Sequence, residues 1–150
     1  MAIPGTRPET ALRLTRTFQA PREKVFRAWT DPEALKEWYG PAGWSAPSAE
    51  VDLRAGGGYR IAMKGPDGEE IRLSGTFREV RPPERLVYTW RWDHWEAGMQ
   101  ESLVTVELAG KGGSAEFTLT HERFPEKTLC DQHEMGWTWT LDCLAKHLGG

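Results

Sequence analysis

The chain has 150 residues and a mass of 17.0 kDa, the common size of one globular domain. Its net charge of -3 excludes the strongly basic surface that general binding to nucleic acid or anionic membranes requires. Two cysteines form no disulfide framework, and no apolar run approaches the length that spans a bilayer. We expect a cytoplasmic protein, monomer or homodimer, with a tail over 1–10 and one domain over 11–150. Its eight tryptophans must fill a core or line a cavity.

The first part of the domain predicts a strand followed by two helices. Apolar and polar residues alternate over 11–18, which is typical of a half-buried strand. Pro21 stands where a helix can begin without losing a hydrogen bond, and an apolar stripe follows it. Asp31 is a suitable N-cap for a second short helix over 32–38.

The middle of the chain predicts an antiparallel meander. Turn residues occupy 40–47, and period-two alternation then predicts strands at 49–53, 58–64, 71–80, 85–92, 101–108 and 114–121. Short turns between these strands favour hairpin neighbours. In the strand over 85–92, Thr89 and Arg91 are expected to face solvent. The covered face of that strand then carries Tyr88, Trp90 and Trp92.

The last segment predicts one long helix. It begins near Pro125 and ends at the closing Gly149-Gly150 pair, so it would be about 23 residues and roughly 35 Å long. Gly136 interrupts this helix, and we expect it to mark a close approach to another backbone or to a large ring. The inner face carries Leu129, His133, Trp137, Leu141, Leu144 and Leu148. The pattern predicts an α+β fold in which a sheet wraps around a helix.

Two motifs invite chemical interpretations that their context does not favour. The glycines at 56–58 lead into a strand, whereas a phosphate-binding loop leads into a helix. Cys130 and His133 lie one helical turn apart and His121 ends a strand, but Cys143 is roughly 20 Å further along the helix. We therefore expect no metal and no cofactor.

The two histidines at 121 and 133 are the most informative polar residues, because both are expected to face inward. They could bond to each other, to tyrosine or to backbone, as buried polar groups generally do. They could also orient a ligand or act as acid and base beside Tyr88. No nucleophile elbow or inward carboxylate pair accompanies them, which favours the structural interpretation over an enzyme. Whether the aromatic residues line a cavity or form a solid core stays open at this point.

Several segments resemble one family. Residues 20–41, APREKVFRAWTDPEALKEWYGP, are similar to the opening of START-like (SRPBCC superfamily) domains of the heat-shock-protein-90 ATPase activator homologue type. The glycine turn over 52–60 and the hairpin segments 75–80 and 83–90 also resemble this family, as does the helix around 136–144. The resemblance implies the helix-grip fold, with a curved antiparallel sheet around a long C-terminal helix and two short helices after the first strand.

The resemblance constrains function less than fold. The superfamily includes lipid carriers, polyketide cyclases and plant hormone receptors, and the type to which this chain is similar implies a bacterial protein linked to stress response. The chaperone activator that gives the type its name has a separate first domain with an Asn-Trp-His-Trp motif. That domain has no counterpart here. The residues Trp92-Asp93-His94-Trp95 resemble the motif only superficially, because they are expected in a hairpin between strands.

Three hypotheses follow. The first is a binding module in which a cavity between sheet and helix accepts a small apolar or aromatic molecule. The second is a chaperone-associated interaction protein that uses Trp44 and Trp95 as contacts. The third is a cyclase or hydrolase that uses His121 and His133. The ligand-binding residues expected for the first are Trp38, Tyr59, Met63, Phe77, Tyr88, Trp90, Trp92, His121, His133 and Trp137.

Overall fold

The computed structural model describes residues 11–39, 43–93, 101–124 and 126–149. The tail over 1–10 and Pro125 lie outside these residues, as does most of the turn predicted over 93–98. The predicted order of elements and the α+β helix-grip architecture are confirmed. The elements are β1 Leu12–Phe18, α1 Arg22–Thr30, α2 Pro32–Trp38, β2 Ser45–Val51, β3 Gly58–Lys64, β4 Glu70–Arg81, β5 Arg85–Trp92, β6 Ser102–Lys111, β7 Ser114–Glu122 and α3 Lys127–His147.

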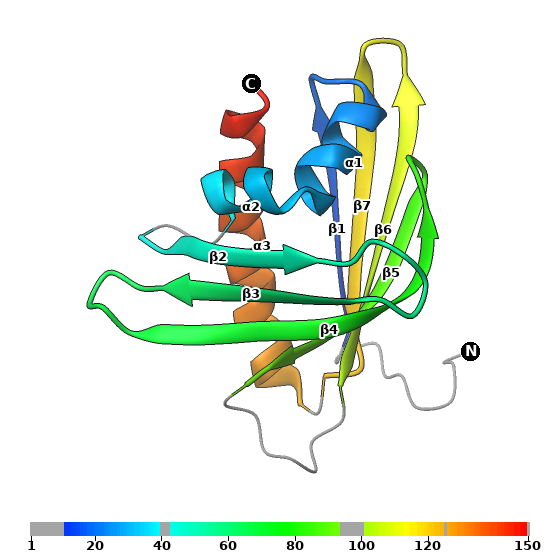
Figure 1. Cartoon of the computed structure of the whole chain (residues 1–150). Coiled ribbons are helices and arrows are strands. Elements are labelled where there is room, and N and C mark those ends of the chain that lie inside the picture. The colour runs from blue at the N-terminus through cyan, green and yellow to red at the C-terminus, as the bar shows by residue number, and fades with distance from the viewer. Residues whose placement is uncertain (1–10, 40–42, 94–100, 125, 150) are drawn as a thin grey trace.

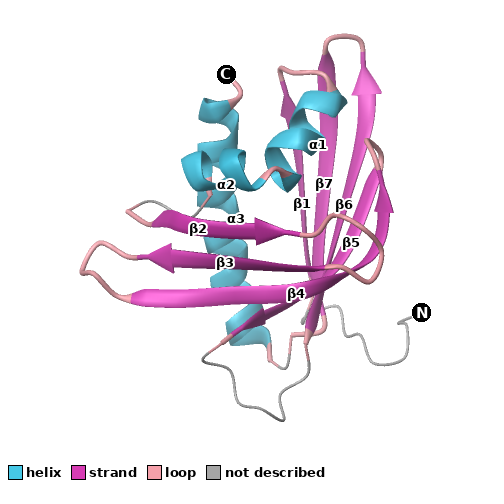
Figure 2. Cartoon of the chain, viewed as in Figure 1, coloured by secondary structure: helices cyan, strands magenta, loops and turns pink. Residues whose placement is uncertain are grey.

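The seven described strands form one open antiparallel sheet in the order β1-β7-β6-β5-β4-β3-β2. Figure 1 shows β1, β5, β6 and β7 running along the length of the molecule, whereas β2, β3 and the first part of β4 run across it. The long helix α3 lies on the inner side of this bent sheet, and α1 and α2 cover its upper end (Figure 2). The helices therefore cover the inner face of the sheet.

The two parts of the sheet meet in β4, where the ladder is interrupted. The register of β4 with β5 has no pair for Gly75 or Thr76. Side chains supply hydrogen bonds instead: the Thr76 backbone N–H donates to Thr89 Oγ1 at 2.8 Å, and Tyr59 Oη donates to the Thr89 carbonyl oxygen at 2.6 Å. Thr89 is consequently only 3% exposed. The prediction that it faces solvent is wrong, because the bend in the sheet uses both its side chain and its carbonyl group.

The two short helices form as the sequence predicts. Pro21 precedes α1 in an extended conformation. Asp31 caps α2, since its carboxylate accepts the Glu33 backbone N–H at 3.0 Å, and Pro32 occupies the first helical position. Asp31 is the single residue between α1 and α2, and Tyr39, the residue after α2, is buried.

The start of β2 differs from the prediction. Residues 45–47 were expected to be part of a turn, but β2 begins at Ser45 and includes Pro47. β2 is an edge strand, and its register with β3 shifts between Ser45 and Ser48. A proline that cannot donate to the ladder is tolerated at such an irregular edge.

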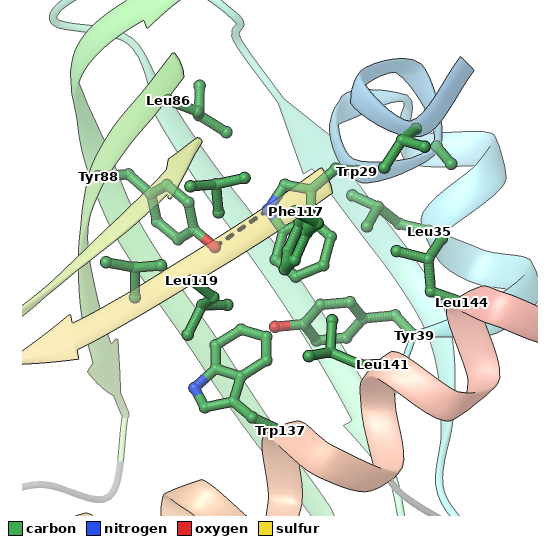
Figure 3. Packing of buried hydrophobic residues seen from close by; sticks show 14 of the residues in the cluster. Trp29, Leu35, Tyr39, Leu86, Tyr88, Phe117, Leu119, Trp137, Leu141 and Leu144 are labelled. Atoms are coloured by element: carbon green, nitrogen blue, oxygen red, sulfur yellow. Dashed lines mark hydrogen bonds between the residues drawn. The ribbon is translucent and has the colours of Figure 1, made fainter. Parts of the chain in front are cut away.

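The core is rich in aromatic rings and is centred on Trp29 of α1. Its indole lies 5.1 Å from the Phe117 ring, stacks on Trp137 at 5.7 Å and contacts Trp38 at 5.4 Å. Trp29 Nε1 also donates to Tyr88 Oη at 3.2 Å, as Figure 3 shows. One helix residue thus joins β5, β7, α2 and α3. Among the described residues, no helix has the length and apolarity required to cross a bilayer.

Candidate functional site

A cavity of about 410 Å³ lies between α3 and the strands β3, β4 and β5. This volume is within the range of natural small-molecule sites. No described residue of its wall is Lys, Arg, Asp or Glu, so a charged ligand would find no counter-ion there. The wall consists of Tyr39, Trp44, Met63, Ile71, Trp90, Trp92, Gln132, His133, Gly136, Trp137 and Thr140.

Five of the residues predicted for the site lie in this wall. They are Met63 of β3, Trp90 and Trp92 of β5, and His133 and Trp137 of α3. The Trp90 ring lies 4.9 Å from that of Trp137 and meets Trp92 edge-on at 5.4 Å. Three indoles from a strand and a helix therefore form one continuous aromatic surface.

Three other predicted residues pack at the opposite end of the inner face. The rings of Tyr59, Phe77 and Tyr88 lie 5.2 to 5.9 Å from one another beneath α1 and α2. The space beside them is about 30 Å³, far smaller than the cavity of about 410 Å³. This end of the fold is core and the other end is hollow. Trp38 also lies outside the cavity, with Nε1 donating to the Ala28 carbonyl oxygen at 2.9 Å.

His121 is fully buried behind the cavity wall and supports it. Trp137 Nε1 donates to His121 Nδ1 at 3.0 Å, and because an indole nitrogen only donates, the histidine proton is on Nε2. Nε2 then donates to Ser102 Oγ at 2.7 Å, and Ser102 donates to the Trp90 carbonyl oxygen at 3.0 Å. Burial, together with His133 nearby, lowers the pKa of His121 well below its ordinary value. The neutral ring therefore holds Trp137 in place.

His133 supports the wall from α3 in a similar way. Trp92 Nε1 donates to His133 Nε2 at 2.8 Å, so the proton is on Nδ1, which donates to the Leu129 carbonyl oxygen at 2.8 Å. The rings of His121 and His133 are 5.7 Å apart, but His121 does not reach the cavity. This geometry gives no support to an acid–base pair acting on a ligand. No metal-binding group of three or more His, Cys, Asp or Glu occurs among the described residues, and Cys130 and Cys143 are free thiols.

Gly136 lies in the cavity wall and not against another backbone. A Cβ built at this position meets no atom within 4 Å beyond its own helix. The predicted close approach is therefore wrong, and the missing side chain leaves open space. This glycine contributes volume to the cavity at the expense of helix propensity.

Gly136→Ala is accordingly expected to stabilise the protein by about 0.5–1 kcal/mol, because it removes the helix penalty of glycine without a clash. Urea unfolding followed by far-ultraviolet circular dichroism measures this change. A loss of stability would show that the helix needs glycine here for a reason other than space.

Six residues of the wall escaped the sequence analysis. Gly136 and Thr140 follow His133 by three and seven positions, so helical periodicity could have found both. Tyr39 follows the end of α2, and Trp44 precedes β2, so no regular period places either residue. The remaining two are Ile71 and Gln132.

Comparison with known proteins places this chain in a family. A family model described as "Activator of Hsp90 ATPase homolog 1-like protein" matches residues 19–149. The chain belongs to this family. Membership of the Activator of Hsp90 ATPase homolog 1-like family supports a ligand-binding or activator-like domain in general. None of the curated proteins compared with this sequence matches it.

Solved structures support the same assignment. A protein from Chromobacterium violaceum is 31% identical, with a TM-score of 0.85 over 94% of this chain and 98% of its own. A protein of Silicibacter pomeroyi that bears the family's abbreviated name is also 31% identical, with a TM-score of 0.81 over 92% of this chain and 96% of its own. A Nitrosomonas europaea protein is 29% identical, with a TM-score of 0.81 over 95% and 96%. This Activator of Hsp90 ATPase homolog 1-like chain therefore resembles bacterial proteins along nearly their whole length.

The chaperone contacts proposed from the sequence gain no support from the structure. Trp44 is only partly exposed and lines the cavity, while Trp95 lies outside the described residues. Trp44 therefore belongs to the cavity wall.

Proposed function

We propose that this protein binds a small, uncharged, apolar or aromatic molecule in the cavity beside α3. The observation that carries the proposal is the wall itself, which contains four tryptophans and no charged side chain among the described residues. Large flat rings bury much apolar area and pair favourably with an aromatic ligand. A charged ligand would lose its hydration without gaining a counter-ion. The wall therefore selects for neutral molecules.

The wall is also built to keep its shape. The indole N–H groups of Trp92 and Trp137 are both bonded to histidine nitrogens, which fixes the two rings before any ligand arrives. A preformed site loses less conformational freedom on binding than a mobile one. This order supports ligand binding over a cavity left by loose packing.

Titration with 1-N-phenylnaphthylamine, an uncharged aromatic probe, tests the proposal. We expect saturable quenching of tryptophan fluorescence with one site per chain. Gly136→Phe places a ring in the open space beside the helix and is expected to weaken binding at least about tenfold, because the probe and the new side chain compete for one volume.

Met135→Phe is the matched control, since Met135 is the adjacent residue of α3 and is 59% exposed. It introduces the same ring on the outer face and should leave the affinity unchanged. Linear quenching without saturation would contradict the proposal. Equal loss of binding in both variants would place the probe outside the cavity.

A further inference from the structure

Tyr39 places a polar group in the cavity wall that the interactions described so far do not use. It follows α2 directly, and its backbone N–H donates to the Leu35 carbonyl oxygen at 2.9 Å, which anchors the residue. The side chain is 6% exposed and crosses toward α3, and Figure 3 shows its hydroxyl pointing toward Trp137. The two rings meet at 90° with 6.5 Å between centroids.

The Tyr39 hydroxyl has no hydrogen-bond partner among the residues that the structure describes. The two other tyrosines of the chain differ in this respect, since Tyr59 Oη donates to the Thr89 carbonyl oxygen and Tyr88 Oη accepts from Trp29. Burial raises the pKa of Tyr39 well above its ordinary value, and Tyr88 raises it further, so the group stays an O–H donor. A neutral phenol that lines a cavity without a protein partner can donate to an acceptor on a bound molecule.

The other polar side chains of the wall are less suited to orient a ligand. Thr140 Oγ1 already donates to the Gly136 carbonyl oxygen, and both ring nitrogens of His133 are engaged. Trp90 Nε1 is a buried donor without a partner in the described part of the chain, but surrounding atoms cover it. Gln132 carries both amide donors and an acceptor, whereas Tyr39 is the aromatic residue of the wall whose O–H can meet an acceptor on a ligand.

We propose that the ligand of this cavity is a neutral aromatic molecule with an oxygen acceptor, such as a ketone carbonyl, that receives a hydrogen bond from Tyr39. This inference rests on the proposed function and narrows its ligand class. The aromatic part packs against the indoles of Trp90 and Trp137, and the oxygen lies at the α2 end of the cavity. Tyr39 then decides the orientation of the ligand.

Two probes of nearly equal shape test this inference. 2-Acetylnaphthalene carries a carbonyl oxygen, and 2-isopropenylnaphthalene carries a methylene group in its place. Their affinities are measured by displacement of 1-N-phenylnaphthylamine from the wild-type protein and from Tyr39→Phe. We expect Tyr39→Phe to bind the ketone about 2- to 10-fold more weakly, the usual net effect of one hydrogen bond, and the alkene equally well.

Tyr59→Phe is the matched control, because it removes a buried hydroxyl outside the cavity wall that does have a partner. It should lower the melting temperature and leave the preference for ketone over alkene unchanged, whereas Tyr39→Phe should not lower the melting temperature. If neither probe binds the wild-type protein, the proposed function fails. If both probes bind and Tyr39→Phe weakens the two equally or not at all, the Tyr39 hydroxyl donates no hydrogen bond to the ketone. This inference is then overturned, while the proposed binding function stands.

Discussion

Gly75→Ala is expected to lower the free energy of unfolding by at least about 3 kcal/mol, the upper part of the range for overpacked sites. A Cβ at this position would overlap the Thr89 carbonyl oxygen and lie 2.7 Å from Cε1 of Tyr59. Neither neighbour can yield easily, because the first is backbone of β5 and the second is a buried ring held by its own hydrogen bond. Urea unfolding measures the loss.

Gly113→Ala is the control for that substitution. Gly113 lies in the turn between β6 and β7, and a Cβ there meets no atom within 4 Å. We expect its effect to stay within about 0.5 kcal/mol. A Gly75→Ala protein as stable as the Gly113→Ala protein would show that β4 does not need a glycine at its bend.

Acidification is expected to destabilise the protein below about pH 6.5, by up to about 1.4 kcal/mol for each pH unit. The pKa of His121 is depressed in the folded state, chiefly by burial, and returns to its ordinary value when the chain unfolds. Between these two values the unfolded chain binds one more proton than the folded chain. Stability is therefore complete above the unfolded value and falls as the pH falls toward the folded value.

Urea unfolding at about pH 7.5, 6.5 and 5.5 tests the role of His121. His121→Gln should be less stable at the highest pH, because its packing changes, but its stability should depend less on pH over this window. The slope of the wild-type protein over the same window is the reference for this comparison. An unchanged slope in His121→Gln would assign the acid sensitivity to another group.

Local signals predicted most element boundaries correctly. The range predicted for α2 matches the structure because Asp31 caps it and Pro32 opens it, and β3 and β5 match because turn residues flank them. The failures have tertiary causes. Pro47 belongs to a strand because β2 is an irregular edge, and Thr89 is buried because its hydroxyl accepts the Thr76 backbone N–H where β4 and β5 lack paired residues.

The site was predictable only in part, for a reason visible in the inner face of the sheet. Alternation shows that Tyr59, Tyr88 and Trp90 face inward, but it cannot show where along that face the helices leave space. α1 and α2 fill the end beneath which Tyr59 and Tyr88 pack, and the hollow end lies beside Gly136. Tyr39 had no periodic signal, because it follows the end of α2 and lies outside any regular element.

The aromatic rings described above also give the protein a particular optical property. Five indoles, from Trp38 through Trp29, Trp137 and Trp90 to Trp92, follow one another with centroid separations of 5.4, 5.7, 4.9 and 5.4 Å. At such separations the electronic transitions of neighbouring rings couple, so light absorbed in the solid core is shared with the rings of the cavity wall. The near-ultraviolet circular dichroism of this chain therefore reports a collective state of three helices and one strand, and it vanishes when their packing loosens.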